Sequence, residues 1–294
     1  MIQLYTDTSA NLTSDIIKEY GIKLVPFTYR VDGKDSDQSP EGDFDGKAFY
    51  DAMRNGAMVK TSMINIVDFM DGFREALDKG DDVLYIGMSG GISGAAHAAS
   101  IAVMELEDEY PDRKIVAIDT FAASLGEGLL VIKAAKMLAA GVELERIVDI
   151  IEEDRNTMCQ YFTVDDLEYL KRGGRLSGIA TIVGTLLKIK PVLKGDEEGK
   201  IVSCGKARGR QAALLMLAEK YEKLAFKNGS APNKPPQAAW SEFKSRCDAG
   251  IRVRNSLPEF AAEAIEKAMP HFAKKLKGFD SDDALLTAVE SRSS

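Results

Sequence analysis

The sequence contains few of the side chains that bind metals or form disulfides: 3 cysteines and 2 histidines among 294 residues. Cys159, Cys204 and Cys247 are too few and too scattered for a disulfide framework or a CxxC metal site, so we expect a reducing compartment. His97 and His271 leave little material for a zinc or non-haem iron site. We therefore expect a protein without a metal or other cofactor.

Excess positive charge and long apolar runs are also missing. The 38 Lys and Arg residues against 46 Asp and Glu give a net charge of -8, which opposes non-specific binding to nucleic acid. The most apolar stretch, Ala122–Ala140, includes Glu127, Lys133 and Lys136, so it does not suit a bilayer span. Met1–Leu12 lacks the basic and apolar regions of a secretory signal. These features predict a cytoplasmic protein with at most transient membrane contact.

What is present is typical of a globular α/β protein, with 45% hydrophobic and 29% charged residues. Short apolar runs alternate with longer stretches of helical periodicity, which predicts mainly parallel sheets covered by helices. The length predicts two α/β domains, 1–155 and 156–294. The clearest predicted elements are strands over Ile2–Thr6, Ile22–Val31, Asp82–Gly87 and Lys114–Asp119 and helices over Ile66–Leu77, Leu125–Ala139 and Arg210–Ala225.

The last 69 residues, Phe226–Ser294, differ from the rest in composition. They carry 11 Lys and Arg against 9 Asp and Glu, a charge of +2, whereas the preceding 225 residues carry -10. A linker-like stretch, Asn228–Pro236, precedes three predicted helices. We expect a helical ending, which is either a divergent part of the second domain, an appended segment or a foreign terminus.

Small hydroxyl residues and glycines follow four predicted strands. The carboxyl ends of parallel strands and the helix N-termini beside them form ligand sites, so the hydroxyls of Thr61, Ser62 and Ser93 suit a carboxylate or phosphate. The alternative is that each hydroxyl only caps its helix. The aspartates at these ends either contact a ligand or pin a neighbouring loop. The four segments are Asp7–Ser9, Lys60–Ser62, Ser89–Gly94 and Asp119-Thr120.

The segment Gly87–Gly91 offers a second reading, because Gly-Met-Ser-Gly-Gly fits the G-x-S-x-G nucleophile elbow of serine hydrolases. A triad would need Ser89, an aspartate and His271. His97 lies only eight residues from Ser89 in the following predicted helix, a position more typical of packing. A serine hydrolase therefore stays open as the alternative function.

A basic segment, Leu167–Ser177, places Lys171, Arg172 and Arg175 around two glycines. Guanidinium groups held in this way suit a phosphate or an acidic partner surface. The alternative is a solvated helix end whose cations complement the helix dipole.

Taken together, five motifs resemble those of the DegV family in order and spacing, over roughly Met1–Ala225. The family has two α/β domains with a lipid in the cleft between them, and its studied members bind fatty acids. The resemblance implies a non-enzymatic protein that presents a long-chain fatty acid to a separate fatty acid kinase. The motifs are Thr6–Leu12, Lys60–Ser62, Ser89–Gly94, Asp119-Thr120 with Leu125–Gly128, and Asp166–Ser177.

Carried over residue by residue, the resemblance makes Thr61, Ser62 and Ser93, with the amide of Gly94, the clamp for the fatty acid carboxylate. It also places Arg172 and Arg175 near the ligand mouth and the kinase-facing surface. Apolar residues near these motifs are candidates for lining the acyl chain, although ordinary core packing is the more frequent reason for such residues. They are Ile64, Ile92, Phe121, Ile179, Ile182, Leu186 and Leu187.

Overall fold

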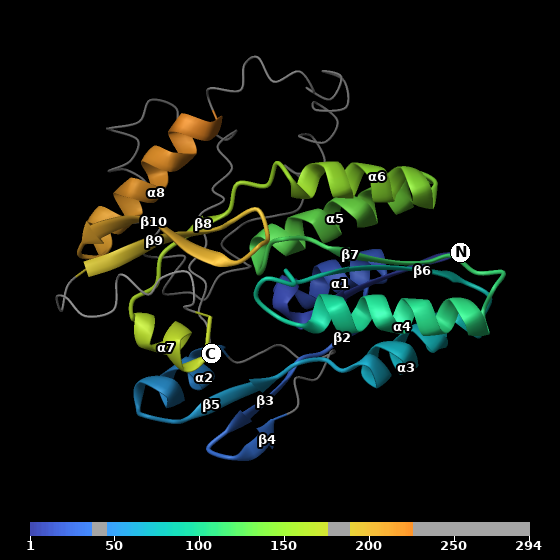
Figure 1. The fold of residues 1–294 in the computed structure, drawn as a ribbon, viewed down its shortest axis with the longest axis horizontal. Coiled ribbons are helices and arrows are strands. Elements are labelled where there is room, and N and C mark those ends of the chain that lie inside the picture. The colour runs from blue at the N-terminus through green and yellow to red at the C-terminus, as the bar shows by residue number, and fades with distance from the viewer. Residues whose placement is uncertain (37–45, 176–188, 226–294) are drawn as a thin grey trace.

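The computed structural model describes residues 1–36, 46–175 and 189–225 (Figure 1). Four predicted acyl-chain residues, Ile179, Ile182, Leu186 and Leu187, lie outside these ranges. The predicted helical ending, 226–294, lies outside them as well, and His271 with it.

The central element is a four-stranded sheet of order β2-β1-β6-β7, and every neighbouring pair is parallel. Its strands are β1 (Ile2–Asp7), β2 (Lys23–Val25), β6 (Asp82–Gly87) and β7 (Ile115–Asp119). Parallel neighbours require crossover connections, and helices supply them here. The predicted α/β class is therefore confirmed.

Helices cover both faces of this sheet (Figure 1). One face packs against α3 (Ile66–Leu77) and α4 (Ala95–Glu109). The other packs against α1 (Ser14–Tyr20), α5 (Leu125–Ala139) and α6 (Leu144–Arg155). The predicted bounds of α3 and α5 are confirmed, because their apolar periodicity and their end signals agree.

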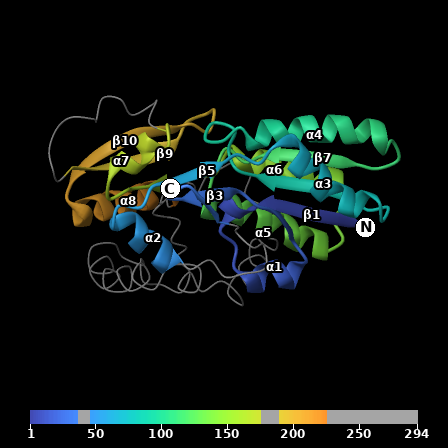
Figure 2. The ribbon, with the colours of Figure 1, turned by 90° about the horizontal axis from the view of Figure 1, so that it is seen from below.

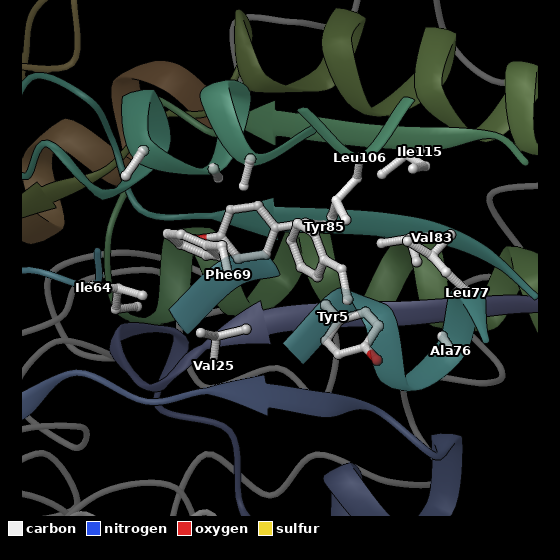
Figure 3. Close-up of a cluster of buried hydrophobic side chains, with 14 of the residues drawn as sticks. Tyr5, Val25, Ile64, Phe69, Ala76, Leu77, Val83, Tyr85, Leu106 and Ile115 are labelled. Carbon is white, nitrogen blue, oxygen red and sulfur yellow. The ribbon is translucent and has the colours of Figure 1, made fainter. Parts of the chain in front are cut away.

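Two apolar cores follow from the alternation of side chains along each strand. Tyr5 and Tyr85 point to the face covered by α3 and α4, whereas Leu4 and Leu84 point to the opposite face. Figure 3 shows the first core, in which the rings of Phe69 and Tyr85 meet edge to face at 5.0 Å between centroids. Burial of each such side chain stabilises the fold by about 1.5–3 kcal/mol.

A second sheet, of order β4-β3-β5, is antiparallel. It contains β3 (Thr28–Val31), β4 (Lys34–Ser36) and β5 (Val59–Ser62), with α2 (Gly46–Arg54) between β4 and β5. This sheet corrects two expectations about the loops. The Asp-, Gly- and Ser-rich segment Asp32–Gly46, whose composition predicts a loop, includes β4, and Lys60–Ser62 forms the end of β5 rather than a loop beyond a strand.

The single strand predicted over Ile22–Val31 is also wrong. The structure has two strands there, β2 in the parallel sheet and β3 in the antiparallel one, with Pro26 and Phe27 between them. Proline has no backbone N–H and cannot continue a ladder, which is a local reason for the break.

The third sheet, β10-β9-β8, is antiparallel and lies at the end of the molecule opposite the N-terminus (Figure 2). Helix α8 packs against it. The predicted helix over Arg210–Ala225 is confirmed, and the glycines of Gly195–Gly199, which predict a hairpin turn, lie where β9 turns back into β10. The elements of this part are β8 (Tyr161–Phe162), α7 (Leu167–Arg172), β9 (Ile189–Gly195), β10 (Ile201–Arg208) and α8 (Arg210–Ala225).

Candidate functional site

The loop Met88–Gly94 joins β6 to α4, and carboxylates from the two neighbouring strands hold it. The backbone N–H of Met88 donates to Asp7 Oδ2 at 3.1 Å. The N–H of Gly90 donates to Asp119 Oδ2 at 2.9 Å. Both aspartates therefore pin this loop, which is one of the two roles that the sequence predicted for them.

Ser93 lies near the end of this loop and is only 7% exposed. Its Oγ accepts a hydrogen bond from the N–H of Ala95 at 3.3 Å, and within the described ranges no atom accepts the hydroxyl hydrogen. Gly94 follows as the N-cap of α4 and has no side chain to cap the helix. A buried hydroxyl hydrogen beside the positive end of a 15-residue helix suits a bound anion.

The end of β5 lies against this helix start. A Cβ built on Gly94 would lie 2.5 Å from Met63 Sδ, so the half-exposed side chain of Met63 reaches over the start of α4. Thr61 and Ser62 directly precede Met63, and their side chains are exposed. Through the side chain of Met63, the segment with two predicted clamp hydroxyls thus contacts the residue that follows the third.

The described candidates for the acyl chain occupy three different surroundings. Ile64 is 2% exposed and belongs to the core beside Phe69 (Figure 3). Ile92 is half-buried and packs against the small core of the third sheet. Phe121 has a backbone φ of 53°, and the guanidinium of Arg155 lies 4.7 Å from its ring centroid.

The two predicted arginines differ in their contacts. Arg175 Nε donates to the carbonyl oxygen of Ile92 at 3.1 Å, which ties the Gly-Gly turn after α7 to the loop Met88–Gly94. Arg172 is exposed and forms a 3.8 Å ion pair with Glu168 of its own helix. The structure therefore brings Arg175, but not Arg172, to the loop that carries Ser93.

The hydrolase alternative is not supported. Ser89 is fully buried, and its Oγ donates to the carbonyl oxygen of Gly199 at 3.0 Å while it accepts from the N–H of Gly91 at 3.1 Å. A serine nucleophile needs its hydrogen directed to a general base, and here the carbonyl of the β9–β10 turn takes it. His97 is exposed on α4.

An acidic pair lies beneath this loop, and its glutamate is not among the site residues predicted from the sequence. Asp7 and Glu127 are both fully buried, and the hydroxyl of Ser9 lies between them. Burial and the negative charge of Asp7 hold the pKa of Glu127 well above its usual range. The available signal was a glutamate between two glycines in the first turn of a largely apolar helix.

Two absences in the described ranges concern metals and membranes. No cluster of His, Cys, Asp and Glu side chains there is arranged to hold a metal ion. No helix there has both the length and the apolar character needed to cross a bilayer.

The architecture is that of an open, parallel α/β sheet with hydroxyls and amides gathered beyond the carboxyl ends of its strands, where such folds bind ligands. The chain belongs to the DegV family, because the family model described as an uncharacterised protein of the DegV family matches residues 1–266. The resemblance found in the sequence is thereby confirmed.

Relatives and solved structures agree with this assignment. A DegV domain-containing protein of Clostridium perfringens is 38% identical over 220 residues, which are 75% of this chain and 76% of the relative. A DegV family structure from Thermus thermophilus, described as fatty acid binding, has a TM-score of 0.67 and 33% identity over 76% of this chain and 78% of its own. The fatty acid binding DegV family protein of Streptococcus agalactiae has a TM-score of 0.67 and 31% identity over 77% and 78%.

Proposed function

We propose that this protein binds a long-chain fatty acid and holds its carboxylate with Thr61, Ser62, Ser93 and the amide of Gly94. The observation that carries the proposal is the packing of Met63 against Gly94, which brings the end of β5 to the buried hydroxyl at the start of α4. The two solved relatives described as fatty acid binding support the class of ligand.

The chemistry of the clamp suits a carboxylate better than a neutral group. Hydroxyls and a backbone amide donate charge-assisted hydrogen bonds, which are shorter and stronger than neutral ones. The N-terminal end of α4 adds a favourable dipole without an ion pair. The carboxylate is thus held by several hydrogen bonds, and no cationic side chain of the clamp neutralises its charge.

The remaining parts of the proposal concern the acyl chain and the partner. The chain would lie in a cleft between domains 1–155 and 156–294. A separate fatty acid kinase would phosphorylate the carboxylate, so this protein binds its ligand and performs no catalysis, and Arg172 and Arg175 would face the kinase. The proposed lining residues are Ile64, Ile92, Phe121, Ile179, Ile182 and Leu186.

Identification of the bound lipid tests the proposal directly. Purified protein is denatured, extracted with organic solvent and analysed by mass spectrometry, and we expect a long-chain fatty acid in near-stoichiometric amount. Delipidated protein should then bind added fatty acid. Protein that is empty on purification and stays empty after incubation with fatty acids contradicts the proposal.

The clamp and the partner surface need separate variants. Successive residues of a strand point to opposite faces, so Thr61→Val and Ser62→Ala measured singly show which hydroxyl contacts the carboxylate. Arg172→Glu should reduce phosphorylation by a fatty acid kinase and leave lipid binding unchanged. Lys79→Glu is the matched control, because Lys79 is exposed and precedes β6. It therefore lies at the N-terminal ends of the parallel strands, away from the loop that carries Ser93.

A further inference from the structure

Asp7 and Glu127, the acidic pair below the loop Met88–Gly94, share a single hydroxyl group between them. Ser9 Oγ lies 2.5 Å from Asp7 Oδ1 and 2.6 Å from Glu127 Oε2. A serine hydroxyl has one hydrogen and cannot donate to two ionised carboxylates at once. One of the two carboxyl groups must therefore carry a proton and donate it to Ser9 Oγ, which then donates to the other.

The hydrogen bonds at Asp7 identify it as the ionised partner. Its Oδ2 accepts from the Tyr85 hydroxyl at 2.8 Å and from the N–H of Met88 at 3.1 Å. Its Oδ1 also accepts from the N–H of Ser9 at 2.8 Å. Three donors besides the Ser9 hydroxyl stabilise a negative charge on this carboxylate.

Among the residues that the structure describes, Glu127 has no comparable set of donors. Its Oε1 lies 3.4 Å from Thr6 Oγ1, but that hydroxyl donates at 2.7 Å to the carbonyl oxygen of Ile86. A fully buried carboxylate without donors and beside an ionised Asp7 is strongly disfavoured, so the proton belongs on Glu127.

The hydrogen bonds of Asp7 also reach the loop that carries Ser93. Asp7 accepts from the first residue of the loop, Met88, and the N–H of Ser93 donates to the carbonyl oxygen of Ser89 at 3.0 Å. The orientation of Asp7 therefore sets where the loop begins, and the turn after it sets where the Ser93 hydroxyl lies.

We propose that Glu127 is a neutral carboxylic acid which, through the hydroxyl of Ser9, keeps Asp7 ionised and oriented, and that the two acids are positioning residues for the carboxylate site. This inference rests on the proposed fatty acid site, since neither acid is proposed to touch the ligand. In this arrangement Asp7 carries the only negative charge of the pair, so Glu127 adds no further repulsion against the anionic ligand.

Two substitutions separate the neutral acid from a charged one. Glu127→Gln keeps an uncharged donor for Ser9 Oγ, and we expect its fatty acid affinity to stay within about twofold of the unaltered protein. Asp7→Asn replaces one acceptor oxygen by a donor that faces other donors, and we expect at least about tenfold weaker binding. A loss in Glu127→Gln as large as that in Asp7→Asn overturns the proposal.

An infrared measurement tests the protonation state without any ligand. The unaltered protein at neutral pH should show the carbonyl stretch of a buried, protonated carboxylic acid, and Glu127→Gln should lack that band. An unaltered protein without the band overturns the inference even if it binds fatty acid. A protein with the band that binds no fatty acid contradicts the proposed function instead, so the two failures are distinguishable.

Discussion

The hydroxyl of Ser89 donates to the carbonyl oxygen of Gly199 at 3.0 Å, across 110 positions of the sequence. This bond joins the loop after β6 to the turn between β9 and β10. The backbones meet closely, because a Cβ built on Gly91 would lie 2.5 Å from the carbonyl oxygen of Glu198. The loop that carries Ser93 is therefore held from the C-terminal sheet as well as from the parallel one.

This contact predicts a large effect of Gly199→Ala on stability. Gly199 has a φ of +70°, and a Cβ there would lie 2.0 Å from Ser89 Oγ. Gly33→Ala is the matched control, because Gly33 has a φ of +79° with open space around it. In urea unfolding, both should lose about 1–3 kcal/mol from backbone strain, and Gly199→Ala should lose clearly more. Equal losses would mean that the turn does not contact the loop in solution.

Ser89 should behave as a structural residue. Ser89→Ala leaves the carbonyl oxygen of Gly199 without its donor and should lower the free energy of unfolding by about 1–3 kcal/mol. A fluorophosphonate probe should not label the native protein, because the hydroxyl is buried and directed to a carbonyl. Labelling that disappears in Ser89→Ala would restore the hydrolase reading.

Ser93→Ala should weaken fatty acid binding by about 1–3 kcal/mol, since it removes a buried donor to a carboxylate. Calorimetric titration of delipidated protein measures the change. Ser100→Ala is the control: Ser100 is an exposed residue further along α4, and its hydroxyl donates to the carbonyl oxygen of Ala96. An unchanged affinity in Ser93→Ala would remove this hydroxyl from the site.

Arg175 should restrain the loop, whereas Arg172 should not. Arg175→Ala removes the hydrogen bond to the carbonyl oxygen of Ile92, so amide hydrogens of residues 88–94 should exchange faster. Arg172→Ala is a control of the same residue type, because its ion pair lies within α7. Equal protection of the loop in both variants would show that the bond to Ile92 contributes nothing measurable.

The buried acid predicts a definite pH dependence. The folded-state pKa of Glu127 is raised well above 4.5, so the folded protein keeps a proton that the unfolded chain loses. The stability that this group contributes is thus full below about pH 4.5 and is lost as the pH rises towards the folded-state value. The facing groups are Asp7 and Tyr85, and the pKa of Tyr85 is itself raised well above 10.

Glu127→Gln removes this titration. Unfolding in urea at a series of pH values should show the variant gaining stability relative to the unaltered protein as the pH rises above 4.5. A difference that stays constant across this range would mean that Glu127 is ionised in both states.

Local sequence signals predicted the long elements well. Helix α3 shows apolar periodicity over Ile66–Leu77 and is preceded by a capping box, in which Asn65 accepts from the N–H of Asp68 at 3.0 Å. The strand Asp82–Gly87 and the helix Leu125–Ala139 are equally clear, because the interactions that stabilise them span only a few residues. The prediction of one strand over Ile22–Val31 was wrong, because the chain passes at Pro26 from the parallel sheet to an antiparallel one.

The sequence by itself determined the α/β class, the main helices and the motifs that identify the family. Only the tertiary structure decided what individual side chains do. Ser89 lies in a motif typical of a nucleophile, yet its hydroxyl donates a hydrogen bond to a carbonyl oxygen 110 positions away. Likewise, Glu127 in the sequence is one of three charged residues in a largely apolar helix, and only packing buries it beside Asp7, at the end of β1, and Ser9, in the turn that follows. Periodicity and caps arise within one or two turns of chain, whereas protonation and hydrogen-bond direction depend on neighbours that only packing supplies.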